Sequence, residues 1–224
     1  MPKQRSKIIK DLIMDNINVL QAMQSLDLIL EDIEENEIKK WVNNELNGYH
    51  ENIDLPKYRK THAMLIGNVQ VGYSLYKNIN IPLSDPQAIE MFTKIEVKEP
   101  VSKIIQMAKA ENESKEHSLL LEVNTILVNH YQQTNGDVIS AYRKLSLYAY
   151  NSILAMIKDK LLEIFKLLEK NYGNLDELYI DFSDKSKKDD VLKELCNIIY
   201  NDNSINIGDN NQLKNSVVGD NNGN

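Results

Sequence analysis

The sequence predicts an α+β protein that is mostly α: a helical bundle with a small antiparallel β insert and a C-terminal β-repeat tail. Three observations lead to this prediction. Apolar residues recur at helical spacing through most of the 224-residue chain. Between residues 62 and 82 the period changes to the alternation that is typical of strands. From Asn201 onward the composition becomes Asn, Asp and Gly with isolated branched aliphatic residues.

The first part of the chain predicts three short helices. Ser6 precedes a helical apolar stripe that ends near Ile17, and a second apolar face follows through Ile33. Asn36 is placed to cap a third helix, and Gly48 supplies the left-handed residue that ends it. Helices of this length depend on packing their apolar faces together, so we expect a compact N-terminal helical unit.

The β insert is expected at about residues 60–82. Gly67 and Asn68 are compatible with two arrangements: they turn a tight hairpin, or Gly67 lies at a bulge in one longer strand. Pro82 interrupts the strand pattern, and Asp85 is placed to cap a helix that begins at Pro86.

The helical period returns after Pro100, and we expect a further helix from Leu119 to Tyr131. Asp137 is placed to cap the longest helix of the chain, which the pattern extends to about Lys170, before Gly173. Its expected apolar stripe comprises Val138, Tyr142, Leu145, Ala149, Ile153, Met156, Leu161, Phe165 and Leu168.

A principal domain is therefore expected at residues 1–183, followed at 184–203 by a charged connector and a short amphipathic helix. The tail, residues 204–224, contains a repeat in which the Ile207-Gly-Asp-Asn-Asn sequence recurs eleven residues later from Val218. Two repeats cannot bury a core alone, so an ordered tail needs another chain. We expect a homo-oligomer formed through the aliphatic residues Ile205, Ile207, Leu213, Val217 and Val218. A terminus without regular structure is the alternative.

Charge and composition limit the classes of partner and site. The net charge of −7 argues against a dedicated, chain-wide nucleic-acid surface, because phosphate binding needs concentrated Lys and Arg. A single cysteine, Cys196, is typical of a cytoplasmic protein without disulfides, and no run of apolar residues is long enough to span a membrane. The four histidines are scattered and no catalytic motif is present, so we expect no metal, no cofactor and no catalytic residue.

The most distinctive pattern lies between Asn36 and Arg59. At helical spacing with its apolar neighbours, Trp41 is expected in the core. Glu45 is placed to pair with Arg59, which would hold the Leu55-Pro56 segment against the third helix.

The order Trp41, then Glu45-Leu46-Asn47-Gly48-Tyr49, then Leu55-Pro56 with Tyr58-Arg59, resembles the N-terminal signature of the AbiTii domain family of bacterial abortive-infection proteins. The resemblance implies a role in blocking phage multiplication, and it carries no catalytic residues over to this chain. The candidate residues for partner binding or for the structural signature are Trp41, Glu45, Tyr49, Tyr58 and Arg59.

The first hypothesis is a non-enzymatic, self-associating sensor or effector that engages a phage or host protein. Two alternatives stay open. One is a nuclease-like enzyme whose carboxylates converge only in the fold, and the other is a scaffold that recruits a separate effector.

Overall fold

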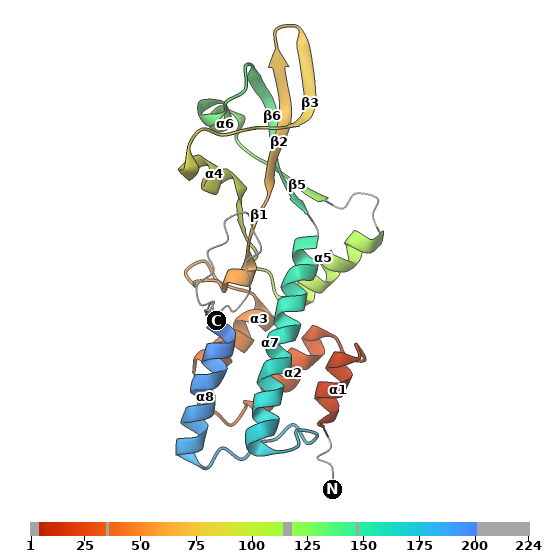
Figure 1. The fold of residues 1–224 in the computed structure, drawn as a ribbon, viewed down its shortest axis with the longest axis vertical. Coiled ribbons are helices and arrows are strands. Elements are labelled where there is room, and N and C mark those ends of the chain that lie inside the picture. The colour runs from red at the N-terminus through yellow and green to blue at the C-terminus, as the bar shows by residue number, and fades with distance from the viewer. Residues whose placement is uncertain (1–4, 35, 114–117, 147, 201–224) are drawn as a thin grey trace, which may run out of the picture.

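A computed structural model of the protein describes residues 5–34, 36–113, 118–146 and 148–200, without the side chains of 110–113. It has a helical body from which a β arm extends at one end (Figure 1). The body comprises α1 (Lys7–Ile13), α2 (Val19–Ile29), α3 (Glu37–Asn47), α5 (Val101–Glu113), α7 (Tyr148–Tyr172) and α8 (Lys185–Tyr200). The arm comprises β2 (Met64–Val71), β3 (Ser74–Asn80), β5 (Ser118–Glu122), β6 (Asp137–Ser146), α4 (Pro86–Thr93) and α6 (Thr125–Tyr131). The α+β class, mostly α with a small antiparallel sheet, is confirmed.

Helix α7 is the centre of the helical body. One face of α7 buries apolar side chains such as Ile157, Leu161 and Phe165, and this helix contacts α1, α2, α5 and α8. The three expected N-terminal helices are confirmed as α1, α2 and α3. The Asn36 side chain accepts hydrogen bonds at the start of α3, and Gly48 follows its end with a φ of 91°.

The arm is a four-stranded antiparallel sheet with the strand order β3-β2-β6-β5. A second, smaller core lies between the sheet and the helices α4 and α6, where Val69, Phe92, Val128 and Val138 are buried together. The predicted start of α4 is confirmed, because the Asp85 side chain accepts a hydrogen bond from the Gln87 amide.

Gly67 lies within one long strand, β2, so a hairpin turn at this glycine is wrong. The register against β3 shifts between Gly67 and Val69, and the chain turns only at Gly72, whose φ is +57°. A Cβ atom on Gly67 would lie 2.1 Å from the Ser140 carbonyl oxygen. The close approach of β6 therefore requires glycine at this position.

The expected long helix from Asp137 to Lys170 is wrong in its first part, since residues Asp137–Ser146 form strand β6. Pairing with β2 skips Ile139, because Asn68 faces Ser140 while Val69 faces Val138. This irregularity leaves Val138, Ala141 and Leu145 buried at intervals of three and four residues. A bulged strand thus imitates the spacing of a helix.

Two further expectations are corrected. Residues 119–131 do not form one helix: Ser118–Glu122 pair with β6 as the edge strand β5, and α6 begins only after Asn124. Three consecutive leucines give this edge strand no alternation that would distinguish it from a helix. The charged stretch after Asp184 is helical, because α8 already begins at Lys185.

The expected β-repeat tail lies outside the described residues. Within the described part, no helix is both long and apolar enough to cross a bilayer.

Candidate functional site: a buried ionic network beside a pocket

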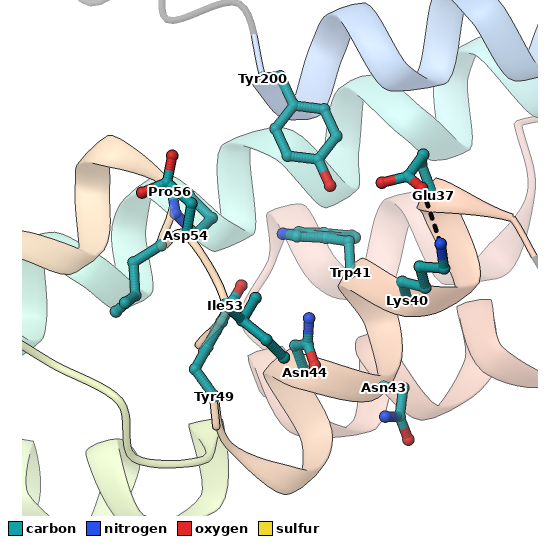
Figure 2. A pocket seen from close by; sticks show the side chains of 11 residues that line it. Glu37, Lys40, Trp41, Asn43, Asn44, Tyr49, Ile53, Asp54, Pro56 and Tyr200 are labelled. Carbon is teal, nitrogen blue, oxygen red and sulfur yellow. Dashed lines mark hydrogen bonds and ion pairs between the residues drawn. The ribbon is translucent and has the colours of Figure 1, made fainter. Parts of the chain in front are cut away.

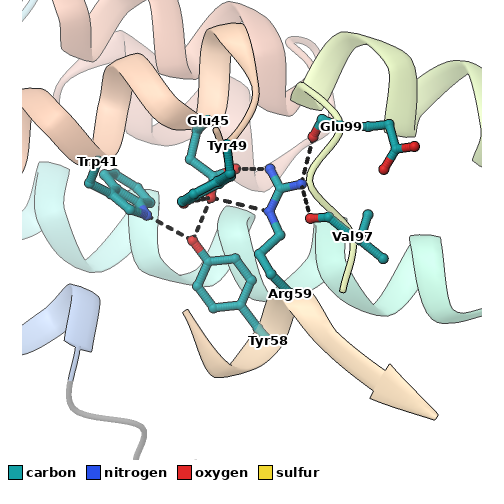
Figure 3. A network of polar contacts seen from close by, with 7 residues as sticks. All are labelled: Trp41, Glu45, Tyr49, Tyr58, Arg59, Val97 and Glu99. Carbon is teal, nitrogen blue, oxygen red and sulfur yellow. Dashed lines mark hydrogen bonds and ion pairs between the residues drawn. The ribbon is translucent and has the colours of Figure 1, made fainter. Parts of the chain in front are cut away.

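The structure brings the five signature residues together at the junction between the helical body and the arm (Figure 3). Trp41, Glu45 and Tyr49 come from α3 and the residues just after it, whereas Tyr58 and Arg59 come from the short 3-10 helix η1 (Lys57–Arg59).

The centre of this network is an ion pair between Glu45 and Arg59, as the sequence predicts. Both side chains are fully buried, and the guanidinium donates from Nη2 to Glu45 Oε2 and from Nε to Glu45 Oε1 at 3.3 Å. The remaining guanidinium nitrogen, Nη1, donates to the carbonyl oxygens of Glu99 at 2.7 Å and Val97 at 3.3 Å. All three guanidinium nitrogens therefore have acceptors.

Aromatic residues complete the coordination of the carboxylate. The hydroxyl groups of Tyr49 and Tyr58 both donate to Glu45 Oε1 at 2.7 Å, and the Trp41 indole Nε1 donates to the Tyr58 hydroxyl at 2.7 Å. The Arg59 guanidinium also lies 5.2 Å from the centre of the Tyr49 ring. Burying a charged pair is favourable only when such additional bonds satisfy its polar atoms.

The burial of these groups shifts their protonation equilibria. Burial, followed by the negative charge of Glu45, raises the pKa of both Tyr49 and Tyr58 above the ordinary tyrosine value. Burial alone lowers the pKa of Arg59, but Glu45 overcomes this effect and the net shift is upward. The network therefore contains one carboxylate, one guanidinium and two neutral phenols.

The network is also the root of the arm. Strand β1 (Lys60–His62) starts directly after Arg59, and β4 (Lys94–Glu96) ends directly before Val97. These strands pair antiparallel, and the Val97 amide donates to the Arg59 carbonyl oxygen at 2.8 Å. Arg59 thus joins the two strands of this ribbon to α3 through Glu45.

Lys160 connects the network to the C-terminal helix. This α7 residue is buried, and its ammonium group lies 5.6 Å from the centre of the Tyr58 ring. The same Nζ atom donates to the Ile198 carbonyl oxygen in the last turn of α8 at 2.8 Å. The end of α8 is therefore held beside the network.

A pocket of about 410 Å³ opens next to the network (Figure 2). Trp41 and Tyr49 form part of its wall and Tyr200, the last residue of α8, lies at its edge. The other lining residues are Glu37, Lys40, Asn43, Asn44, Ile53, Asp54, Leu55 and Pro56. Glu45 and Arg59 do not line it.

No pattern in the sequence predicts this pocket. Two of its walls, Trp41 and Tyr49, belong to the predicted signature, but Ile53 and Tyr200 carry no motif that would identify them. Tyr200 lies at the site only because α8 packs against α3 and α7, and no local sequence pattern predicts this packing. Among the residues that the structure describes, no group of three or more His, Cys, Asp or Glu side chains is arranged to hold a metal ion.

The chemistry of the network is that of a structural joint. Its ionic and phenolic groups are bonded to one another and to backbone carbonyl oxygens, and the carboxylate and guanidinium have no exposed surface. The pocket, in contrast, combines an apolar wall with a polar rim, which is the usual lining of a ligand-binding site.

Replacing the buried cation tests the structural role of the pair. Arg59→Met leaves the buried Glu45 carboxylate uncompensated, and we expect the free energy of unfolding to fall by about 3–5 kcal/mol. The matched control is Lys193→Met, which removes an exposed partner of Asp190 and is expected to cost less than about 1 kcal/mol. Urea denaturation measures both. Equal effects of the two substitutions would contradict the structural role.

The raised phenol pKa values predict loss of stability in alkali. Tyr49 is neutral in the folded protein at a pH where the unfolded chain ionises it, near pH 10. Its contribution to the free energy of unfolding is complete below that pH. As the pH rises further this contribution is lost, at about 1.4 kcal/mol per pH unit. Tyr49→Phe should flatten this decline by about that slope, whereas Tyr179→Phe, at an exposed position, should leave it unchanged. Urea denaturation between about pH 9 and 11 gives the slopes, and identical slopes would overturn this assignment.

Comparison with known proteins identifies the family. The AbiTii family matches residues 6–194, a range that covers the arm, the signature residues and most of the helical body. No curated protein and no solved structure gives a significant match. The chain belongs to the AbiTii family, which links it to abortive infection, a form of antiviral defence.

Proposed function

We propose that the protein acts in bacterial anti-phage defence as a non-enzymatic binding protein. In this proposal the arm engages a phage or host protein in the cytoplasm, and the C-terminal tail joins several copies. The observation that carries the proposal is the concentration of exposed apolar side chains on the arm.

The internal position of the signature supports a structural role for it. Glu45 and Arg59 have no solvent-exposed surface, and Trp41 is almost completely buried. These residues bond to each other rather than facing a substrate. A partner must therefore be recognised by another part of the molecule.

The arm presents such a surface. Its sheet is covered by α4 and α6 on one side only, and the β2-β3 hairpin forms the tip farthest from the helical body (Figure 1). Among the described residues, eighteen large apolar side chains are exposed, and twelve of them lie on the arm, on its strands and on α4 and α6: Met64, Val71, Tyr73, Leu75, Tyr76, Ile89, Met91, Leu119, Leu120, Ile126, Leu127 and Ile139. Such a concentration of apolar surface is typical of a protein-binding site.

The tip of the arm has the residue type that dominates protein interfaces. Tyr73 is fully exposed at the turn, and Leu75 and Tyr76 are about half exposed beside it on the edge strand β3. Tyrosine is enriched among the residues that contribute most to binding energy, because it combines apolar area with a hydrogen-bonding hydroxyl group. The buried ion pair lies at the root of the arm and joins the arm to the body.

The tail supplies multivalency in this proposal. Its repeated Gly-Asp-Asn-Asn sequences alternate with aliphatic residues, as in stacked strands that need several chains. Joining copies would present several arms to one target, which raises avidity through effective concentration without any new contact.

Substitution at the tip tests the recognition step. Tyr73→Ser removes the most exposed aromatic side chain, and we expect the variant to lose phage protection because an interface tyrosine typically accounts for tenfold or greater affinity, about 1.4 kcal/mol or more. Tyr179→Ser, at an exposed position on the body, is the matched control and should protect fully. Plaque counts on cells producing each variant at equal soluble levels are compared. Full protection by Tyr73→Ser would argue against recognition by the tip.

Truncation tests the self-association. Light scattering on the full chain should give a mass of several subunits, whereas a chain that ends at Tyr200 should give the mass of one. A chain with the same tail residues in scrambled order is the control for length and composition, and it too should be monomeric. The same mass for the full and shortened chains would remove assembly by the tail from the proposed function.

A further inference from the structure

We propose that the pocket beside Trp41 is the docking site for the chain's own segment that follows Tyr200. In this arrangement Ile205 and Ile207 insert within the same molecule. The inference goes beyond the proposed function, in which the tail only joins copies, and it does not require that copies join.

The pocket has the anatomy of a peptide-binding site. Its wall contains the apolar surfaces of Trp41, Ile53, Leu55 and Pro56, and Figure 2 shows Tyr200 across from the indole ring. A polar rim of Asn43, Asn44 and Asp54 surrounds this wall. An apolar centre within a polar rim is the usual arrangement where one or two aliphatic side chains of a peptide bind. A volume of about 410 Å³ is ample for them.

The chain leaves the described part of the structure at this pocket. Tyr200 ends α8 and lines the pocket, and residues 201–224 follow it. The last turn of α8, which ends at Tyr200, is tied to α7, because Lys160 donates a hydrogen bond to the Ile198 carbonyl oxygen. The tail therefore starts at the pocket rather than having to cross the surface to find it.

The reach is short. Ile205 is five residues beyond Tyr200, and an extended chain of that length spans at most about 17 Å. A short tether gives the attached segment an effective concentration near its binding site of about a millimolar. The chain's own segment therefore competes strongly against a segment from a second copy.

The sequence after Tyr200 complements the pocket. In Ser204-Ile205-Asn206-Ile207 polar and aliphatic residues alternate, so an extended backbone places both isoleucines on one side. The same alternation turns the Ser204 and Asn206 side chains away from the pocket, toward water, and leaves the backbone amide and carbonyl groups of the segment to bond the amides of Asn43 and Asn44 on the rim. These contacts do not depend on opposite charges on the segment and the pocket.

Docking would also regulate assembly. Ile205 and Ile207 are among the aliphatic residues through which the tail is expected to join copies. While they occupy the pocket they are not available to a neighbouring chain. Release from the pocket would then precede assembly.

Trp41 offers a direct readout, because it is the single tryptophan of the chain and lines the pocket. The experiment compares quenching of its fluorescence by acrylamide in four proteins: the full chain, a chain ending at Tyr200, Ile205→Asp with Ile207→Asp, and the matched control Val217→Asp with Val218→Asp. We expect the first pair of substitutions to raise the quenching constant to that of the shortened chain. The control should keep the value of the full chain. Equal quenching in the full and shortened chains would overturn the proposal.

Dilution separates docking within one chain from docking between copies. The quenching constant of the full chain should not change with protein concentration where light scattering on the same samples shows only monomers. A low constant that appears only together with larger particles would overturn docking within one chain. If no sample assembles while quenching behaves as expected, self-association fails and the docking proposal stands.

A substitution on the pocket side gives an independent measurement. Ile53→Asp places a charge in the pocket wall, while His50→Asp changes an exposed residue of the same loop that does not line the pocket. Hydrogen exchange followed by mass spectrometry should show faster exchange of residues 201–207 in Ile53→Asp than in His50→Asp. The same exchange in both variants would contradict the proposed site.

Discussion

The structure depends on the buried ion pair between Glu45 and Arg59. Burying two charged groups away from water costs free energy unless their polar atoms have hydrogen-bond partners. Here phenol hydroxyls and backbone carbonyl oxygens are those partners. The residues of the network come from α3 and the residues just after it, from η1 and from the segment after β4. The network therefore joins α3 and η1, which are neighbours in sequence, to the distant segment after β4, and it does so where the arm meets the body.

This joint explains why the signature residues and the surfaces available to partners are separate. Arg59 holds both strands of the ribbon at the root of the arm, whereas the exposed side chains around Tyr73 lie at the tip of the β2-β3 hairpin. On the other side, Tyr58 lies against Lys160, which holds the last turn of α8. The same network thus supports the arm and the point from which the C-terminal segment starts. Loss of the ion pair would affect both, although neither surface contains Glu45 or Arg59.

Local chemistry explains how much of this arrangement could be predicted from the sequence. Asn36 and Gly48 delimit α3 through contacts within a few residues, and the pairing of Glu45 with Arg59 follows from a short loop between a helix and a proline. Strand β6 could not be predicted in this way, because the bulge at Ile139 gives its buried residues the spacing of a helix. The pocket could not be predicted from the sequence either, because Tyr200 lies beside it only through the packing of α8 on α3 and α7.

A double-mutant cycle on the ion pair tests the central claim most directly. Glu45→Leu, Arg59→Met and the combined variant are compared with the parent chain by the free energy of unfolding in urea. If the two side chains form one buried unit, the double variant is more stable than the sum of the single effects predicts, with a coupling of about 2 kcal/mol or more. Effects that add to within about 0.5 kcal/mol would contradict the account, because they would mean that each residue acts independently of the other.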